Sequence, residues 1–223
     1  MLPTVTGFAA RRAIAALRKR GVPVDPLLHR VGLSERDLAG DDNSARVTAI
    51  ALAKLLDLAA EATGDSAFGL HLAEQSDPRD AGIIFYVASG AENFGEALAL
   101  FARYFRIVNE AVRLKLTRTE ERLIAEAEFI GLPRHEVRQN AEFGIAAILK
   151  ALREVAGRNI RPTRVAFAHA RNSELREFER FLPLPCRVRP RRERGRIIRP
   201  AGVFRGHARR TAHHCRPEAA QRA

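Results

Sequence analysis

Apolar residues recur every three or four positions along much of the first half of the chain, which is the spacing of one helix face. In the clearest case, apolar residues from Val47 to Ala62 form one stripe, while Lys54 and Glu61 lie on the opposite side. Polar capping residues and glycines mark where such segments begin and end. The pattern predicts helices over Gly7–Arg20, Pro26–Val31, Ser34–Leu38, Ser44–Thr63 and Ser66–Glu74, and a further helix that begins at Asn93.

Two segments in the middle of the chain alternate instead between apolar and charged residues. Val112–Thr117 is apolar on one face and mainly basic on the other, and Leu123–Phe129 is apolar on one face and acidic on the other. This alternation is typical of a β-hairpin. Opposite charges on neighbouring strands add a modest favourable cross-strand term, so we expect the two segments to pair.

Three further elements are predicted after the hairpin. His135–Ala156 reads as the longest helix, Thr163–His169 alternates as a third strand, and Ser173 can cap a helix that ends at Phe181. The order of elements predicts an α+β fold. We expect a helical part over about residues 1–75 and a mixed part, with the hairpin, the long helix and the further strand, over about residues 76–183.

The charge of the chain is concentrated near one end. The chain has 223 residues and a net charge of +12, and residues 184–223 hold 12 Arg and 2 Glu, which leaves a net charge of only +2 for residues 1–183. This basic segment is open to three interpretations: an arm that neutralises phosphates, a metal site at His213, His214 and Cys215, or translation of a GC-rich gene out of its frame. Adjacent ligands lack the paired spacing of a structural zinc site, so we expect no metal. A phosphate-binding arm would use a group of arginines: Arg187, Arg189, Arg191, Arg192, Arg194 and Arg196.

Motifs for catalysis or for crossing a membrane are not found in the sequence. No stretch approaches the roughly 18 uninterrupted apolar residues of a membrane span. Residues 1–183 contain no Cys nucleophile, no phosphate-binding loop and no His pair at metal-ligand spacing. We therefore expect a cytoplasmic protein without cofactor, metal or catalytic residues, and an enzyme acting on a small molecule stays an alternative.

The segment Leu27–Leu38 has the outline of a helix-turn-helix, with a glycine between two short amphipathic helices. Its second helix, however, offers Glu35 and Asp37 where a DNA-reading helix needs basic and amide side chains. We interpret the segment as a structural helical hairpin, and DNA binding through it stays a minority hypothesis.

Several motifs follow one another in an order typical of one regulator family. Residues 62–73 read ATGDSAFGLHLA, residues 80–88 read DAGIIFYVA, and residues 94–98 read FGEAL. A later run places Leu152-Arg153, Gly157-Arg158, Pro162, Val165, Phe167 and His169 in order. From about Thr6 to Phe181 the chain resembles the arabinose-binding-type N-terminal domain of AraC-family transcriptional regulators.

The resemblance implies a domain that senses a small-molecule effector or mediates homodimerisation, while a separate C-terminal domain with two helix-turn-helix motifs binds DNA. Here the basic segment stands where that second domain would begin. We expect a truncated or frame-shifted regulator, which explains the change in composition and the missing domain together. The alternative from another class is a non-specific nucleic-acid binder that uses the basic segment.

A small-molecule site should be mostly apolar with a few convergent polar groups. Ala81–Ser89 is apolar without a clear period, so we expect it to be buried, with Tyr86 as its hydrogen-bonding residue. His71, Tyr104 and Asn109 could supply further polar groups from neighbouring elements. The alternative is that Tyr86 and Tyr104 are core aromatic residues.

Overall fold

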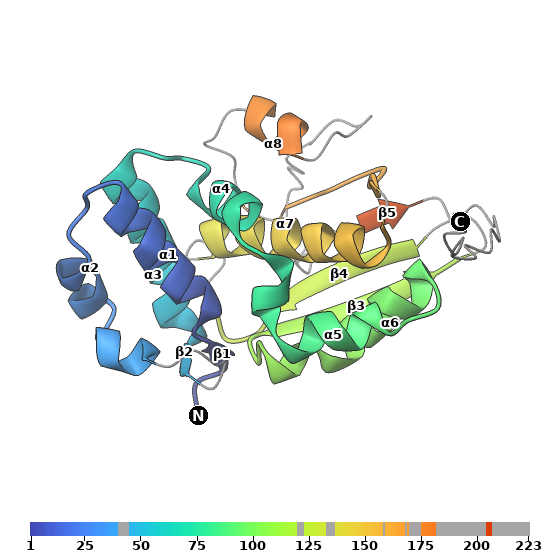
Figure 1. Ribbon diagram of the computed structural model, residues 1–223, viewed down its shortest axis with the longest axis horizontal. Helices are drawn as coiled ribbons and strands as arrows, with labels where there is room; N and C mark the ends of the chain where they lie inside the picture. Colours follow the sequence, from blue (N-terminus) through green and yellow to red (C-terminus); the bar gives the residue numbers. More distant parts are fainter. Residues whose placement is uncertain are drawn as a thin grey trace, which may run out of the picture.

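The computed structural model describes residues 1–39, 45–119, 123–132, 137–157, 159–167, 169, 175–181 and 204–206. In this part of the chain, helices surround two small antiparallel sheets, which confirms the α+β fold (Figure 1). The helices are α1 (Phe8–Lys19), α2 (Asp25–Arg30), α3 (Ala49–Thr63), α4 (Phe68–Gln75), α5 (Ile83–Ser89), α6 (Phe94–Tyr104), α7 (Arg138–Val155) and α8 (Leu175–Phe181), with short 3-10 turns η1 (Glu35–Leu38), η2 (Pro78–Ala81) and η3 (Phe105–Ile107). None of the described helices combines the length and the apolar character that crossing a bilayer requires.

The helical part begins with a two-stranded ribbon that the sequence pattern did not predict. β1 (Thr4–Thr6) pairs with β2 (Arg46–Thr48), so that Val5 lies opposite Val47. The prediction that the following helix begins after Ser44 is therefore wrong: α3 begins at Ala49. The hydroxyl of Thr48 caps it by accepting a hydrogen bond from the backbone N–H of Ala51 at 3.3 Å.

The predicted hairpin is confirmed. β3 (Val112–Arg118) pairs with β4 (Leu123–Phe129), and Arg113 lies opposite Glu128. Their side chains form the expected cross-strand ion pair, with 3.5 Å between guanidinium and carboxylate. Both side chains are largely exposed, so the pair contributes little to stability.

The predicted third strand is wrong, and a different segment takes its place in the sheet. The described residues of Thr163–His169 form no strand; Val165 is buried there, and the Phe167 ring packs on Phe178 of α8. The third strand is β5 (Phe204–Gly206), which pairs with the edge of β4 that β3 leaves open. The basic segment, expected to lie outside the domain, thus contributes at least these residues to the fold.

The long helix α7 packs against α3, α4, α5 and α6 and runs along the three-stranded sheet (Figure 1). Two of its faces serve two different cores. Ala146 and Leu149 belong to the core of the helical part, while Ala151 packs with α5 and α6. The boundary between these two cores therefore runs along α7.

Candidate functional site

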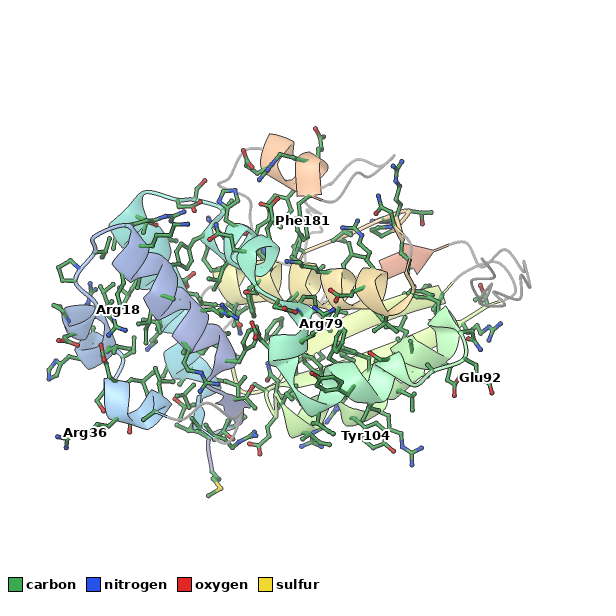
Figure 2. All side chains as sticks on the ribbon, viewed as in Figure 1. Arg18, Arg36, Arg79, Glu92, Tyr104 and Phe181 are labelled. Carbon is green, nitrogen blue, oxygen red and sulfur yellow. The ribbon has the colours of Figure 1, made fainter. Side chains whose placement is uncertain are left out.

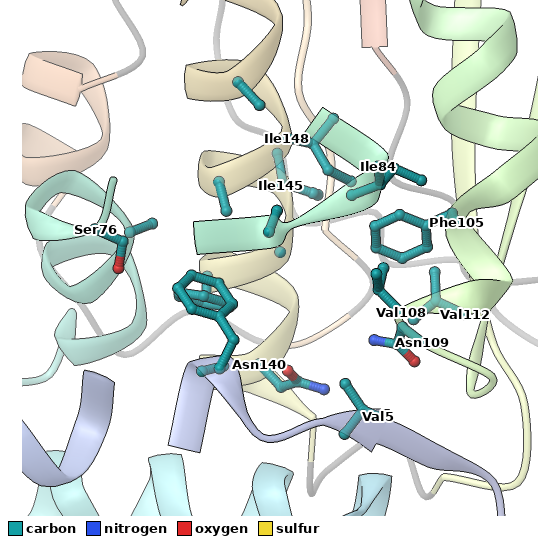
Figure 3. Close-up of a pocket in the computed structure, with 18 of the residues that line it drawn as sticks. Val5, Ser76, Ile84, Phe105, Val108, Asn109, Val112, Asn140, Ile145 and Ile148 are labelled. Carbon is teal, nitrogen blue, oxygen red and sulfur yellow. The ribbon is translucent and has the colours of Figure 1, made fainter. Parts of the chain in front are cut away.

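A cavity of about 110 Å³ lies between the two cores, enclosed by β1, α1, α5, α6, the hairpin and α7. Most of its lining is apolar, and Figure 3 shows Ile84, Ile145 and Ile148 gathered at one end. Asn109 and Asn140 lie at the opposite end, beside Val5. The two asparagines thus lie at one end of the cavity and a group of isoleucines at the other.

Helical and strand geometry bring the lining residues together from distant parts of the sequence. Asn140, Gly144 and Ile148 follow one another at intervals of one turn, so α7 turns a single face to the cavity. On the other side, Val5 of β1 forms an isolated antiparallel β-bridge with Asn109, and the N–H of Thr6 donates to the carbonyl of Val108 at 2.9 Å. These bonds hold the polar end of the cavity in place.

Two further polar residues, Thr6 and Asn140, line this end of the cavity. Their exposed fractions as whole residues are 8% and 6%, and neither side chain is hydrogen-bonded to another described residue. Their polar atoms are not sealed in the packed interior but border the open space of the cavity. Neighbouring Asn109 is partly used, because its side-chain oxygen accepts from the N–H of Ala111 at 3.0 Å and its amide nitrogen stays available. Polar groups that border an apolar cavity are available to bond a ligand.

The two charged residues of the described lining are already engaged. The ammonium of Lys150 donates to the carbonyls of Glu74 and Ser76, each at 2.5 Å. Asp77 accepts from the N–H of Arg79 at 2.9 Å, and this bond holds the pKa of the Asp77 carboxyl below its usual value. Lys150 also contributes to lowering the pKa of Asp77, so the two opposite charges lie close enough to offset each other beside the turn between α4 and η2.

Gly144 lies in the middle of α7 and also lines the cavity. A Cβ added there would meet no atom within 4 Å, so the missing side chain adds to the open space. Glycine inside a helix lowers stability by about 1 kcal/mol relative to alanine. The sequence signal for the cavity was therefore a glycine within a long apolar helix, together with the unusual asparagine one turn before it.

The structure does not bring the four predicted ligand-binding residues together. Among them only Asn109 lines the cavity. Tyr86 is 59% exposed, because α5 turns Ile84 and Phe85 inward and Ile83 and Tyr86 outward. The expectation that the whole of Ala81–Ser89 is buried is therefore wrong for Ile83, Tyr86 and Ser89, which are exposed.

Tyr104 and His71 each have another environment. Tyr104 is half-buried at the end of α6, where the guanidinium of Arg103 lies 5.3 Å from its ring centre. His71 bridges two carboxylates, with Nδ1 at 2.9 Å from Asp65 and Nε2 at 3.2 Å from Glu177 of α8. Burial disfavours the imidazolium, but the hydrogen bonds to Asp65 and Glu177 outweigh it and raise the pKa of His71 above its usual value near 6.5.

These contacts attach α8 to the rest of the domain. Figure 2 shows Phe181, the last residue of α8, beside α7, and its carbonyl accepts from the guanidinium of Arg153 at 3.4 Å. The Arg79 side chain also reaches α7 (Figure 2), where it contacts Glu154 at 2.5 Å. His71 is thus part of the α8 contact, at a distance in the fold from the cavity lining.

The remaining predicted sites concern nucleic acid and metal. The six arginines Arg187, Arg189, Arg191, Arg192, Arg194 and Arg196 lie outside the described residues, as do His213, His214 and Cys215. Within the described ranges, no group of three or more His, Cys, Asp or Glu side chains is arranged to hold a metal ion.

The helix-turn-helix-like segment has acidic side chains that serve structural roles. Asp37 accepts from the N–H and hydroxyl of Ser34, both at 2.7 Å, and Glu35 pairs with Arg18 of α1. These contacts favour the structural interpretation of Leu27–Leu38.

Comparison with known proteins gives one sequence family and a related structure. The sequence profile of the arabinose-binding N-terminal domain of AraC transcription regulators matches residues 21–204. The transcriptional regulator CdpR from Pseudomonas aeruginosa has a similar fold, with a TM-score of 0.50 and 17% identity over 90% of this chain and 54% of that chain. The chain thus spans about half the length of that regulator, and no curated protein sequence matches it. The chain belongs to the arabinose-binding N-terminal domain family of AraC transcription regulators, which are not enzymes.

Proposed function

We propose that the chain senses a small-molecule effector and that the cavity along α7 is the effector site. The observation that carries this proposal is a mostly apolar cavity with Thr6 and Asn140 on its wall, neither of whose side chains is hydrogen-bonded to another described residue. Ligand sites are typically apolar with a few placed polar groups. A bound effector would supply the hydrogen bonds that the protein alone does not make there.

Binding at this place can affect the whole domain, because the walls come from elements far apart in sequence. β1 and α1 supply one side, and α7 and the hairpin supply the other. The 3-10 turn η2 also lines the cavity through Pro78 and Ala81, and an ion pair between Arg12 and Asp80 joins it to α1. An effector that contacts all of them stabilises one arrangement over others by its difference in affinity for the two.

Filling the cavity from Gly144 tests the proposal. We would titrate the full chain and the Gly144→Ala and Gly144→Leu variants with benzyl alcohol, following backbone amide chemical shifts and the melting temperature. The wild type should be stabilised by the probe, Gly144→Ala less so, and Gly144→Leu not at all while keeping a cooperative melt. The proposed site would be contradicted if benzyl alcohol stabilised all three proteins equally, or if it did not stabilise the wild type.

Homodimerisation, DNA contact and a cytoplasmic location belong to the same proposal, since a regulator of this type acts on DNA as part of a larger assembly. Weak DNA binding through the basic segment rests on its net charge of +10, from 12 Arg and 2 Glu. Sedimentation of the full chain tests the dimer. Titration of a labelled random duplex at two salt concentrations tests the DNA contact, which should weaken steeply as salt rises.

A further inference from the structure

We propose that the effector is an uncharged molecule with a small apolar body and one hydroxyl, carbonyl or amide group, held by Thr6, Asn109 and Asn140. This inference rests on the proposed function of the cavity and names the chemistry of its ligand. It follows from which polar groups of the lining are available and which are not.

The polar end of the cavity presents neutral groups that can both donate and accept. The Thr6 hydroxyl and the Asn140 amide border the cavity and bond no other described residue. The Asn109 amide nitrogen can donate, since only its oxygen is used by Ala111. A hydroxyl, carbonyl or amide on the ligand matches this set, because each can accept from an amide N–H or a hydroxyl.

The two charges of the described lining, Lys150 and Asp77, already offset each other, so an ionic ligand would find no unpaired counter-charge there. The Lys150 ammonium already donates to two carbonyls, and the Asp77 carboxylate already accepts from Arg79. A charge moved from water into an apolar cavity without a paired opposite charge is strongly disfavoured. Glu142 lies in the first turns of α7 and adds a negative charge near that end of the helix. Its carboxylate is 3.6 Å from His169 and 3.8 Å from Arg138.

The size of the cavity limits the apolar body. Its volume of about 110 Å³ is comparable to the cavity of roughly 150 Å³ that admits benzene in an engineered protein. Ile84 and Ile148 close the apolar end, and Gly144 leaves the middle of the cavity open. A single ring or a short branched chain therefore fits, with its polar group directed toward Asn140.

Four probes of similar size separate the possible ligand classes. We would measure the dissociation constants of toluene, benzyl alcohol, benzoate and benzylammonium with the full chain at neutral pH. We would then repeat the series with Thr6→Val and Asn140→Leu, which keep the side-chain shape and remove the polar group. Thr117→Val is the matched control, because Thr117 is an exposed strand residue outside the cavity.

Benzyl alcohol should bind the wild type about threefold to tenfold more tightly than toluene, the range expected for one or two net hydrogen bonds. Benzoate and benzylammonium should bind at least about tenfold more weakly than benzyl alcohol. In Asn140→Leu and Thr6→Val the advantage over toluene should shrink to about twofold or less, while Thr117→Val keeps it.

Toluene binding as tightly as benzyl alcohol, tighter binding of either ion, or an unchanged preference in both cavity variants would overturn the inference and leave the cavity as an effector site. If none of the four probes binds the wild type, the proposed function fails as well.

Discussion

Two glycines in neighbouring helices offer a matched test of the packing around α7. Gly144 is in α7 and borders the cavity, whereas Gly69 is in α4 where that helix crosses the start of α7. Gly144→Ala removes the helix penalty of glycine and places the new Cβ in open space. The expected gain is about 1 kcal/mol, which raises the melting temperature of a domain of this size by roughly 2–4 °C.

Gly69→Ala brings the same gain in helix propensity but meets a backbone. The added Cβ would lie 2.9 Å from the carbonyl carbon of Gln139 and closer still to its oxygen, so α4 and α7 must separate. That movement also weakens the 2.8 Å hydrogen bond from the Gly69 N–H to the side-chain oxygen of Gln139. Overpacking of this kind costs about 1–3 kcal/mol, and the lost hydrogen bond about 1 kcal/mol more. We expect a net loss of roughly 1–3 kcal/mol after the gain in propensity.

Thermal melts followed by circular dichroism suit this pair, because the chain has no Trp for intrinsic fluorescence. The two variants should move the melting temperature in opposite directions. A lower melting temperature for Gly144→Ala would mean that the space beside α7 is filled in solution. An unchanged one for Gly69→Ala would refute the close approach of the two helices.

Three other predictions concern the polar network, the cavity and the sheet. The pKa of His71 is raised in the folded protein, so its positive charge stabilises the fold fully below the unfolded pKa near 6.5, and this stabilisation is lost as the pH rises through the folded pKa. The melting temperature should therefore fall between about pH 6 and 9, and in His71→Gln this part of the pH dependence should disappear. Asn140→Leu should leave the unliganded melting temperature unchanged or raise it, because it replaces a polar side chain that bonds no other described residue by an apolar one at the cavity wall, and a clearly lower value would contradict the assignment. Cutting the chain after residue 183 should lower the melting temperature relative to cutting after residue 206, because only the longer chain keeps β5 on β4; equal melts would show that β5 adds no stability.

Local chemistry was enough to predict those elements whose signals lie within one segment. The start of α6 is an example: Asn93 accepts from the N–H of Glu96 at 3.0 Å, as the capping pattern requires. The hairpin is another, since alternation and opposite charge both point to pairing of β3 with β4. Neither prediction depends on distant parts of the chain.

The errors arise where a distant partner decides the local structure. Ser44 and Thr48 are both good helix caps, and only the pairing of Val47 with Val5 extends the chain up to Thr48. Thr163–His169 alternates like a strand, but an alternating segment needs a free sheet edge, and β5 takes the edge of β4. Very short strands such as β1 carry no period of their own.

The cavity shows why the site itself escaped a search by residue type. The tyrosines and the histidine were predicted because their side chains can form directed hydrogen bonds. In the fold, however, Tyr86 is exposed, Tyr104 lies against Arg103, and His71 bridges two carboxylates. The residues that line the cavity are less conspicuous. Gly144 lowers the stability of a helix interior by about 1 kcal/mol relative to alanine, and Thr6 and Asn140 place small neutral polar groups on the cavity wall. None of the three stands out by residue type, and only the fold brings them to the border of one cavity of about 110 Å³.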